Sequence, residues 1–170
     1  MPQSPIEFLR GAARNLDESI ERGKGGLRAD EQFLIGSIKE VIGYGERIFE
    51  KGLCLSSSKD IGSVGYICDG RWVIVRRGDQ ISISKVGNDI AISFTGSEFR
   101  VVRRDAGIII GSRYFKIYLD SYSEEIGFNE YREASKRIYL VKKILPMVLE
   151  ALRKADESFV KCAKLYRVKC

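Results

Sequence analysis

The sequence contains no histidine, and this absence removes the commonest general base at neutral pH. Serine–histidine and cysteine–histidine nucleophiles are excluded with it, and so are the usual zinc sites built from cysteine and histidine. No pair of Asp or Glu residues stands in a recognisable catalytic context. We therefore expect a protein that is not an enzyme and that uses neither a metal nor another cofactor.

Cysteine is scarce, and none of the four cysteines belongs to a C-x-x-C pair. Cys68 and Cys162 stand within apolar patterns, which is typical of small core residues. Cys54 and Cys68 could instead form a disulfide, because intracellular proteins of hyperthermophiles use such bonds. Asn and Gln together number only six, whereas Ile numbers twenty and charged residues make up 31%. This composition favours a thermophile.

The sequence has no apolar run near the roughly 20 residues that a membrane-spanning helix needs. Its first residues lack the basic-then-apolar layout of a signal peptide. We therefore expect a cytoplasmic protein with no membrane partner. A length of 170 residues with 44% hydrophobic residues suits one compact domain plus an extension.

Two helices are predicted before residue 52. Ser4, Pro5 and Glu7 combine a capping box with a proline at the first helical position, so a helix is expected over residues 5–22. The glycines at 23–26 end it, and a second helix is expected over residues 30–51. Internal glycines weaken this second helix, so it either packs very closely on a neighbour or breaks near Gly43.

Residues 64–119 change to short strands that glycine, aspartate and asparagine turns separate. Their alternation predicts an antiparallel β-meander with one face toward the core and one toward water. Together with the two helices, this makes a single α+β domain over residues 1–145. The expected strands are Val64–Asp69, Arg71–Arg77, Gln80–Lys85, Asp89–Thr95, Glu98–Arg104, Ile108–Ile110 and Arg113–Leu119.

A long C-terminal helix is expected over residues 123–168, with Ser123 as its cap. An apolar stripe with spacing of three and four residues runs along it and gives it a coiled-coil-like seam. Pro146 falls within the pattern, which predicts one kinked helix, with two abutting helices as the alternative. The stripe consists of Tyr131, Ala134, Ile138, Val141, Leu145, Val148, Leu152, Ala155, Phe159, Cys162 and Tyr166.

The seam narrows beyond residue 152, where most charged residues take the outer positions. A narrow seam of this kind favours helix pairing, so the outer half of the helix is predicted to extend and form a homodimer. An amphipathic helix packed on its own sheet or on the first two helices is the alternative. The predicted dimerisation residues are Val148, Leu152, Ala155, Phe159, Cys162 and Tyr166.

Positive charge is concentrated in the later parts of the chain. Residues 1–60 carry a net charge of −1, residues 61–123 carry +3 and residues 124–170 carry +4. This excess suits a polyanionic partner. In the last predicted strand, Tyr114, Lys116 and Tyr118 should project away from the core, beside an outward floor of small residues in the neighbouring strands.

Aromatic and basic side chains on a sheet form a platform on which single-stranded bases stack while phosphates are neutralised. The predicted binding residues are Trp72, Arg76, Arg100, Arg104, Tyr114, Lys116 and Tyr118. Ordinary solvent-facing side chains, and a core position for Trp72, are the alternatives, because aromatic residues favour strands in any case.

The order of elements resembles the ThermoDBP group of archaeal single-stranded DNA-binding proteins. The resemblance is carried by the basic and aromatic residues just listed and by the seam from Ile138 to Tyr166. It implies a dimer that binds single-stranded DNA, favoured over RNA, through a cleft beside the sheet.

The leading hypothesis is a non-enzymatic, homodimeric protein that binds single-stranded nucleic acid on the outer sheet face. The alternative is a protein-interaction or scaffolding module. In that alternative the strands close into a pleckstrin-homology-like barrel and the last helix plugs one end. The N-terminal helices or the terminal coiled coil then bind a protein partner.

Overall fold

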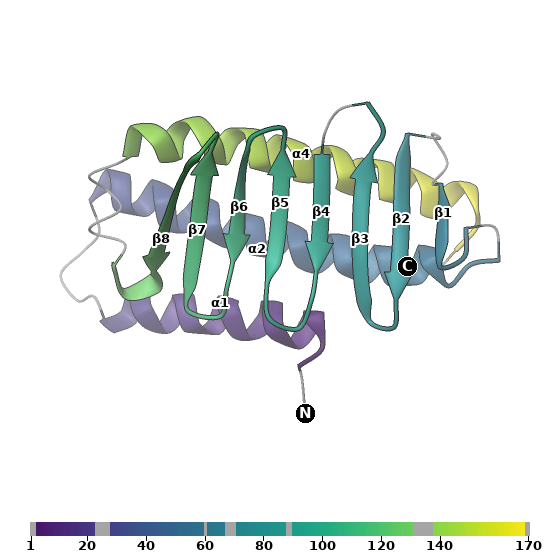
Figure 1. Cartoon of the computed structure of the whole chain (residues 1–170). Helices are drawn as coiled ribbons and strands as arrows, with labels where there is room; N and C mark the ends of the chain where they lie inside the picture. Colours follow the sequence, from purple (N-terminus) through teal and green to yellow (C-terminus); the bar gives the residue numbers. More distant parts are fainter. Residues whose placement is uncertain are drawn as a thin grey trace.

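The computed structural model describes residues 3–22, 28–59, 61–66, 71–87, 90–130 and 138–168. It confirms the α+β class: two N-terminal helices precede an antiparallel sheet, and a long helix follows it (Figure 1). The helices are α1 (Pro5–Arg22), α2 (Ala29–Ser56), the short 3-10 helix η1 (Phe128–Glu130) and α4 (Ile138–Leu165). The strands are β1 (Val64–Tyr66), β2 (Trp72–Arg77), β3 (Gln80–Lys85), β4 (Ile90–Phe94), β5 (Phe99–Arg103), β6 (Ala106–Ile110), β7 (Tyr114–Leu119) and β8 (Tyr122–Gly127).

The two N-terminal helices begin close to where the sequence predicts. The backbone N–H of Glu7 donates to Oγ of Ser4 at 3.2 Å, which is the predicted cap of α1. Helix α2 passes Gly43 without a break and continues to Ser56. A Cβ built on Gly45 would lie 2.9 Å from the Phe99 ring, so this glycine lets α2 lie directly on the sheet. The close-packing interpretation of the α2 glycines is therefore confirmed at this position.

The sheet is an open antiparallel meander in which each strand pairs with the next, in the order β1 to β8. All seven predicted strands are present. The eighth, β8, was assigned to the C-terminal helix, so the predicted helix start at Ser123 is wrong. The residues Ser123, Glu124 and Glu125 resemble a helix N-terminus locally. They belong instead to β8, which pairs with β7 along its whole length. The predicted meander is thus confirmed, and the closed barrel of the alternative interpretation is wrong, because β1 and β8 lie at opposite ends of the sheet (Figure 1).

The strand register aligns β-branched side chains in a continuous row on the inner face of the sheet. Full burial of each such side chain stabilises the fold by about 1.5–3 kcal/mol. Helices α2 and α4 run across this inner face, and α1 packs beside α2 (Figure 1). The row consists of Ile74, Ile83, Ile92, Val101, Ile108 and Ile117, each at most 1% exposed.

Helix α4 is one continuous helix through Pro146, whose position faces solvent. Its seam packs on α2 and on the inner face of the sheet within the same chain. The predicted dimerisation residues Val148, Leu152, Ala155, Phe159 and Cys162 are 0–1% exposed, and Tyr166 is partly buried against the core. Pairing through this seam is therefore wrong, and the alternative of an amphipathic helix on its own domain is confirmed. Tyr131 and Ala134 lie outside the described residues.

The cysteines differ in part from their predicted roles. Cys162 is buried, as expected of a core residue, but it takes part in a disulfide. Cys54 also takes part in a disulfide. Cys68, which was predicted as a partner of Cys54, lies outside the described residues, as does Cys170.

Candidate nucleic-acid interface

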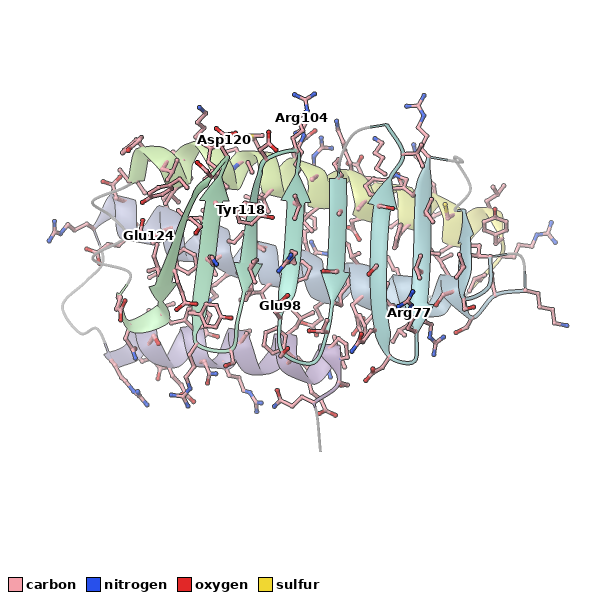
Figure 2. All side chains as sticks on the ribbon, viewed as in Figure 1. Arg77, Glu98, Arg104, Tyr118, Asp120 and Glu124 are labelled. Atoms are coloured by element: carbon pink, nitrogen blue, oxygen red, sulfur yellow. The ribbon has the colours of Figure 1, made fainter. Side chains whose placement is uncertain are left out.

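The outer face of the sheet is the face that α1, α2 and α4 leave uncovered (Figure 1). Two cross-strand rows run over it from β2 to β8. The first row is Val73, Ser84, Ala91, Val102, Gly107, Tyr118 and Ser123, and the second is Val75, Ser82, Ser93, Arg100, Ile109, Lys116 and Glu125. The floor of small residues that the sequence predicts on β3 and β4 is therefore present. Within these two rows the aromatic and charged residues lie on the β5–β8 half of the face, whereas Arg77 lies in the same outer register at the end of β2 (Figure 2).

Two tyrosines of β7 lie against glycines, one within β6 and one in the turn between β6 and β7. Tyr118 pairs with Gly107, and a Cβ on Gly107 would lie 2.8 Å from Cζ of Tyr118. A Cβ on Gly111 would likewise collide with the ring of Tyr114. The glycines thus leave room for each ring to rest against the sheet, with its other side toward solvent. Neither glycine was predicted to lie beside a tyrosine. Gly107 carries the signal of such a close approach, because it stands within a strand, whereas Gly111 stands in a turn.

The charges on this half of the face are nearly balanced. Nη2 of Arg100 lies 3.4 Å from Oε1 of Glu98, and Glu125 stands opposite Lys116 in the strand register. Burial raises the pKa of the Tyr118 phenol above its ordinary value, and the nearby charge of Arg100 partly opposes this. Tyr118 is therefore neutral at physiological pH. The basic side chains around it exceed the acidic ones only slightly in charge.

Two of the predicted binding residues lie on the opposite side of the sheet. Trp72 is 1% exposed in the core, with Nζ of Lys85 5.4 Å from its ring centroid, so its assignment to a binding face is wrong. Arg76 lies in the same inner register and donates to Oγ of Ser57 at 2.8 Å, just beyond the end of α2. It ties the sheet to α2 and does not belong to the outer face.

Arg104 was predicted to end the strand Glu98–Arg104, but β5 ends at Arg103. Arg104 occupies the β5–β6 turn with a φ of 56° and extends beyond the strand (Figure 2). Its solvent-exposed side chain extends the basic character of the face to the turn. Figure 2 shows Tyr118 within the face and Arg104 beyond its upper end.

A basic cluster that the sequence analysis did not identify surrounds Glu150 on α4. Hydrogen bonds from Arg153, together with the charges of Arg153, Lys154 and Arg103, hold the pKa of Glu150 below its ordinary value. The spacing of Glu150, Arg153 and Lys154 was readable as helix-surface pairing. The approach of Arg103 from the sheet could not be predicted in this way, because it depends on where α4 lies.

Among the described residues, no group of histidine, cysteine and carboxylate side chains has the arrangement needed to hold a metal ion. No helix in the described ranges combines the length and apolar character needed to cross a membrane. No protein-family model, curated protein or solved structure matches this chain.

Proposed function

We propose that this protein binds single-stranded nucleic acid, with DNA favoured over RNA, on the β5–β8 half of the outer sheet face, and that it is not an enzyme. The observation that carries the proposal is the placement of Tyr118 and Tyr114 against two glycines on a face that no helix covers. A base can stack on the solvent side of each ring. Such stacking is worth about 1–3 kcal/mol per base by alanine substitution.

The order of side chains along β7 suits an extended strand. Tyr114, Lys116 and Tyr118 are alternate residues, so their side chains leave the same face about 7 Å apart. A nucleic acid that follows β7 meets an aromatic ring, a cation and a second ring in turn. Arg100 lies two strands away on the same cross-strand row as Lys116, within reach of the same backbone. Recognition through base faces and phosphates carries little sequence preference.

The balanced charge of the face predicts a modest salt dependence. If Arg100, Arg104 and Lys116 each neutralise one phosphate, the logarithm of the binding constant should fall with the logarithm of the salt concentration with a slope of about −2. A steeper slope would mean that many other cations contact the nucleic acid. The affinity should therefore come mainly from stacking and should favour single strands over duplex.

Fluorescence anisotropy with a labelled single-stranded oligonucleotide tests the proposal, with duplex as competitor. Tyr118→Ala should weaken binding by about 5-fold to 100-fold, whereas Tyr118→Phe should leave it nearly unchanged because the ring is kept. Tyr139→Ala is the matched control, since Tyr139 is 75% exposed and lies on α4, which packs on the inner face of the sheet. Absence of binding at low salt, or equal binding by wild type and Tyr118→Ala, would overturn the proposal.

A further inference from the structure

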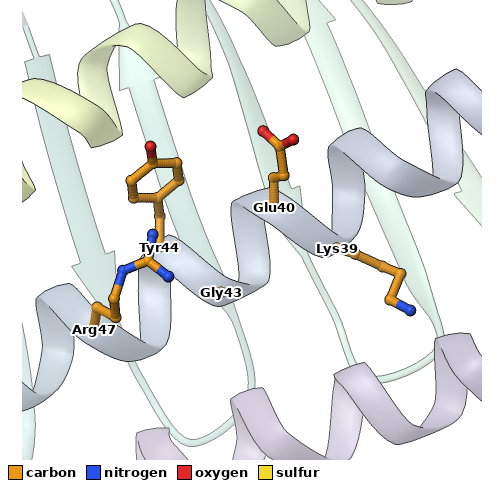
Figure 3. A pocket seen from close by; sticks show the side chains of 5 residues that line it. All are labelled: Lys39, Glu40, Gly43, Tyr44 and Arg47. Carbon is orange, nitrogen blue, oxygen red and sulfur yellow. The ribbon is translucent and has the colours of Figure 1, made fainter.

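Helix α2 presents an uncovered face on the side of the molecule opposite to the outer sheet face. In Figure 3 this helix runs between α1 and α4, with the sheet behind it. A shallow depression lies over Gly43, lined by Lys39, Glu40, Tyr44 and Arg47 (Figure 3). The guanidinium of Arg47 lies 4.4 Å from the centroid of the Tyr44 ring and forms one wall. The face is therefore ordered and recessed at its centre.

Gly36 and Gly43 are seven residues apart and so lie on the same side of α2, although only Gly43 lines the depression. A Cβ on Gly45 or Gly52 would meet side chains of the sheet, which accounts for those glycines. A Cβ on Gly36 would have no atom within 4 Å, and one on Gly43 would meet only Nη1 of Arg47 at 3.9 Å. Glycine weakens a helix interior relative to alanine. No contact with the described residues explains these two glycines.

The same face is complementary to itself in charge. Let two α2 helices cross antiparallel about a two-fold axis between residues 39 and 40. Gly36 of one copy then faces Gly43 of the other, and Lys39 faces Glu40. Within the described part of the chain, Lys39 pairs only with the exposed Asp17, and Glu40 makes no ion pair. Both charged groups can therefore engage a second copy without breaking a buried interaction.

We propose that a second copy of this chain docks on the α2 face and forms an antiparallel homodimer. The helical layer over residues 29–50 is about 33 Å long and, with three helices about 9 Å apart, about 27 Å wide. Its area is thus roughly 900 Å² per copy, which is the size of a standard stable interface.

The dimer leaves both outer sheet faces exposed on opposite sides. This inference therefore goes beyond the proposed function, and either can fail without the other.

Sedimentation velocity over a concentration series tests the dimer, with two charge variants as probes. Lys39→Glu sets acid against acid across the axis, and Glu40→Lys sets base against base. The dissociation constant of each variant dimer should therefore be about tenfold higher than that of the wild type, or more. An equimolar mixture of the two variants should associate again as a heterodimer, because each variant complements the other. Asp17→Asn is the control: it removes the partner of Lys39 within the chain and should leave the dimer intact.

The Lys39 side chain is 51% exposed and Glu40 is also exposed, so both variants should fold, and circular dichroism verifies this. A wild-type monomer at all concentrations up to about 100-fold above a micromolar dissociation constant would overturn the proposal. Persistent dimers in both variants would also overturn it, since the contact would then lie elsewhere. Failure of the mixture to associate, with both variants folded, would refute the antiparallel pairing.

Discussion

Replacing Gly45 by alanine tests how closely α2 lies on the sheet. The new Cβ would lie 2.9 Å from both Cε1 and Cζ of Phe99, closer than carbon atoms approach without a shift. The Phe99 ring is fully buried and stacks on Phe94 with ring centroids 4.8 Å apart, so it has little room to move. Helix propensity favours alanine by about 1 kcal/mol, whereas overpacking a core typically costs about 1–3 kcal/mol. We expect a net loss of up to about 2 kcal/mol in the free energy of unfolding.

Gly11→Ala is the matched control for this substitution. On α1, a Cβ at Gly11 would meet only Nη2 of Arg14, at 3.9 Å, so propensity alone should stabilise the variant by about 1 kcal/mol. Urea unfolding followed by circular dichroism should separate the two variants by about 1–3 kcal/mol. If Gly45→Ala were stabilised as much as Gly11→Ala, the close contact between α2 and the sheet would be refuted.

Four further predictions address the seam, an interhelical ion pair, alkaline stability and the binding face. Leu152→Asp should unfold the protein, because Leu152 is fully buried; a folded variant in circular dichroism would contradict the packing of α4. Asp156→Asn should lower the free energy of unfolding by about 1.5–3 kcal/mol, because Asp156 accepts a 2.5 Å hydrogen bond from the largely buried Lys51, and the loss should shrink in a Lys51→Met background. Burial raises the pKa of the Tyr118 phenol, so the neutral phenol contributes its full stabilisation at a pH below its ordinary pKa of 10. This stabilisation is lost as the pH rises through the pKa of the folded state, and thermal unfolding of Tyr118→Phe should lack this alkaline loss. Glu98→Gln should tighten single-stranded DNA binding by up to about fivefold in anisotropy, since it removes the acid beside a binding cation, and weaker binding would contradict the site.

Local signals in the sequence were sufficient for most of the fold. The capping residues Ser4 and Glu7 placed α1, and the alternation of apolar residues placed seven strands within a few residues of their observed ends. The seam of α4 was also read correctly as a buried stripe. The packing partner of this stripe was predicted wrongly. A spacing of three and four residues suits packing against a helix of the same chain as well as against a helix of a second copy. The choice depends on the position of α2, which no local pattern encodes.

The candidate site was predicted only in part for a similar reason. Tyr114, Lys116 and Tyr118 alternate within one strand, so their common face followed from the period of two residues. Trp72 and Arg76 also share a face, but nothing in their strand distinguishes inside from outside, because both of its faces are apolar. The packing of Tyr118 over Gly107 required the register between β6 and β7. Such contacts between strands arise from pairing and lie beyond single-strand patterns.

The most direct test of the proposed function is to map the binding surface in solution. A ¹⁵N-labelled sample titrated with a short single-stranded oligonucleotide should show amide shift changes for residues of β5 to β8, led by Arg100, Lys116 and Tyr118. The amides of α2 that face away from the sheet, such as Gly36 and Gly43, should stay unchanged during the titration. Shifts confined to the helical layer, or no shifts at saturating oligonucleotide, would contradict the assignment of nucleic-acid binding to the outer sheet face.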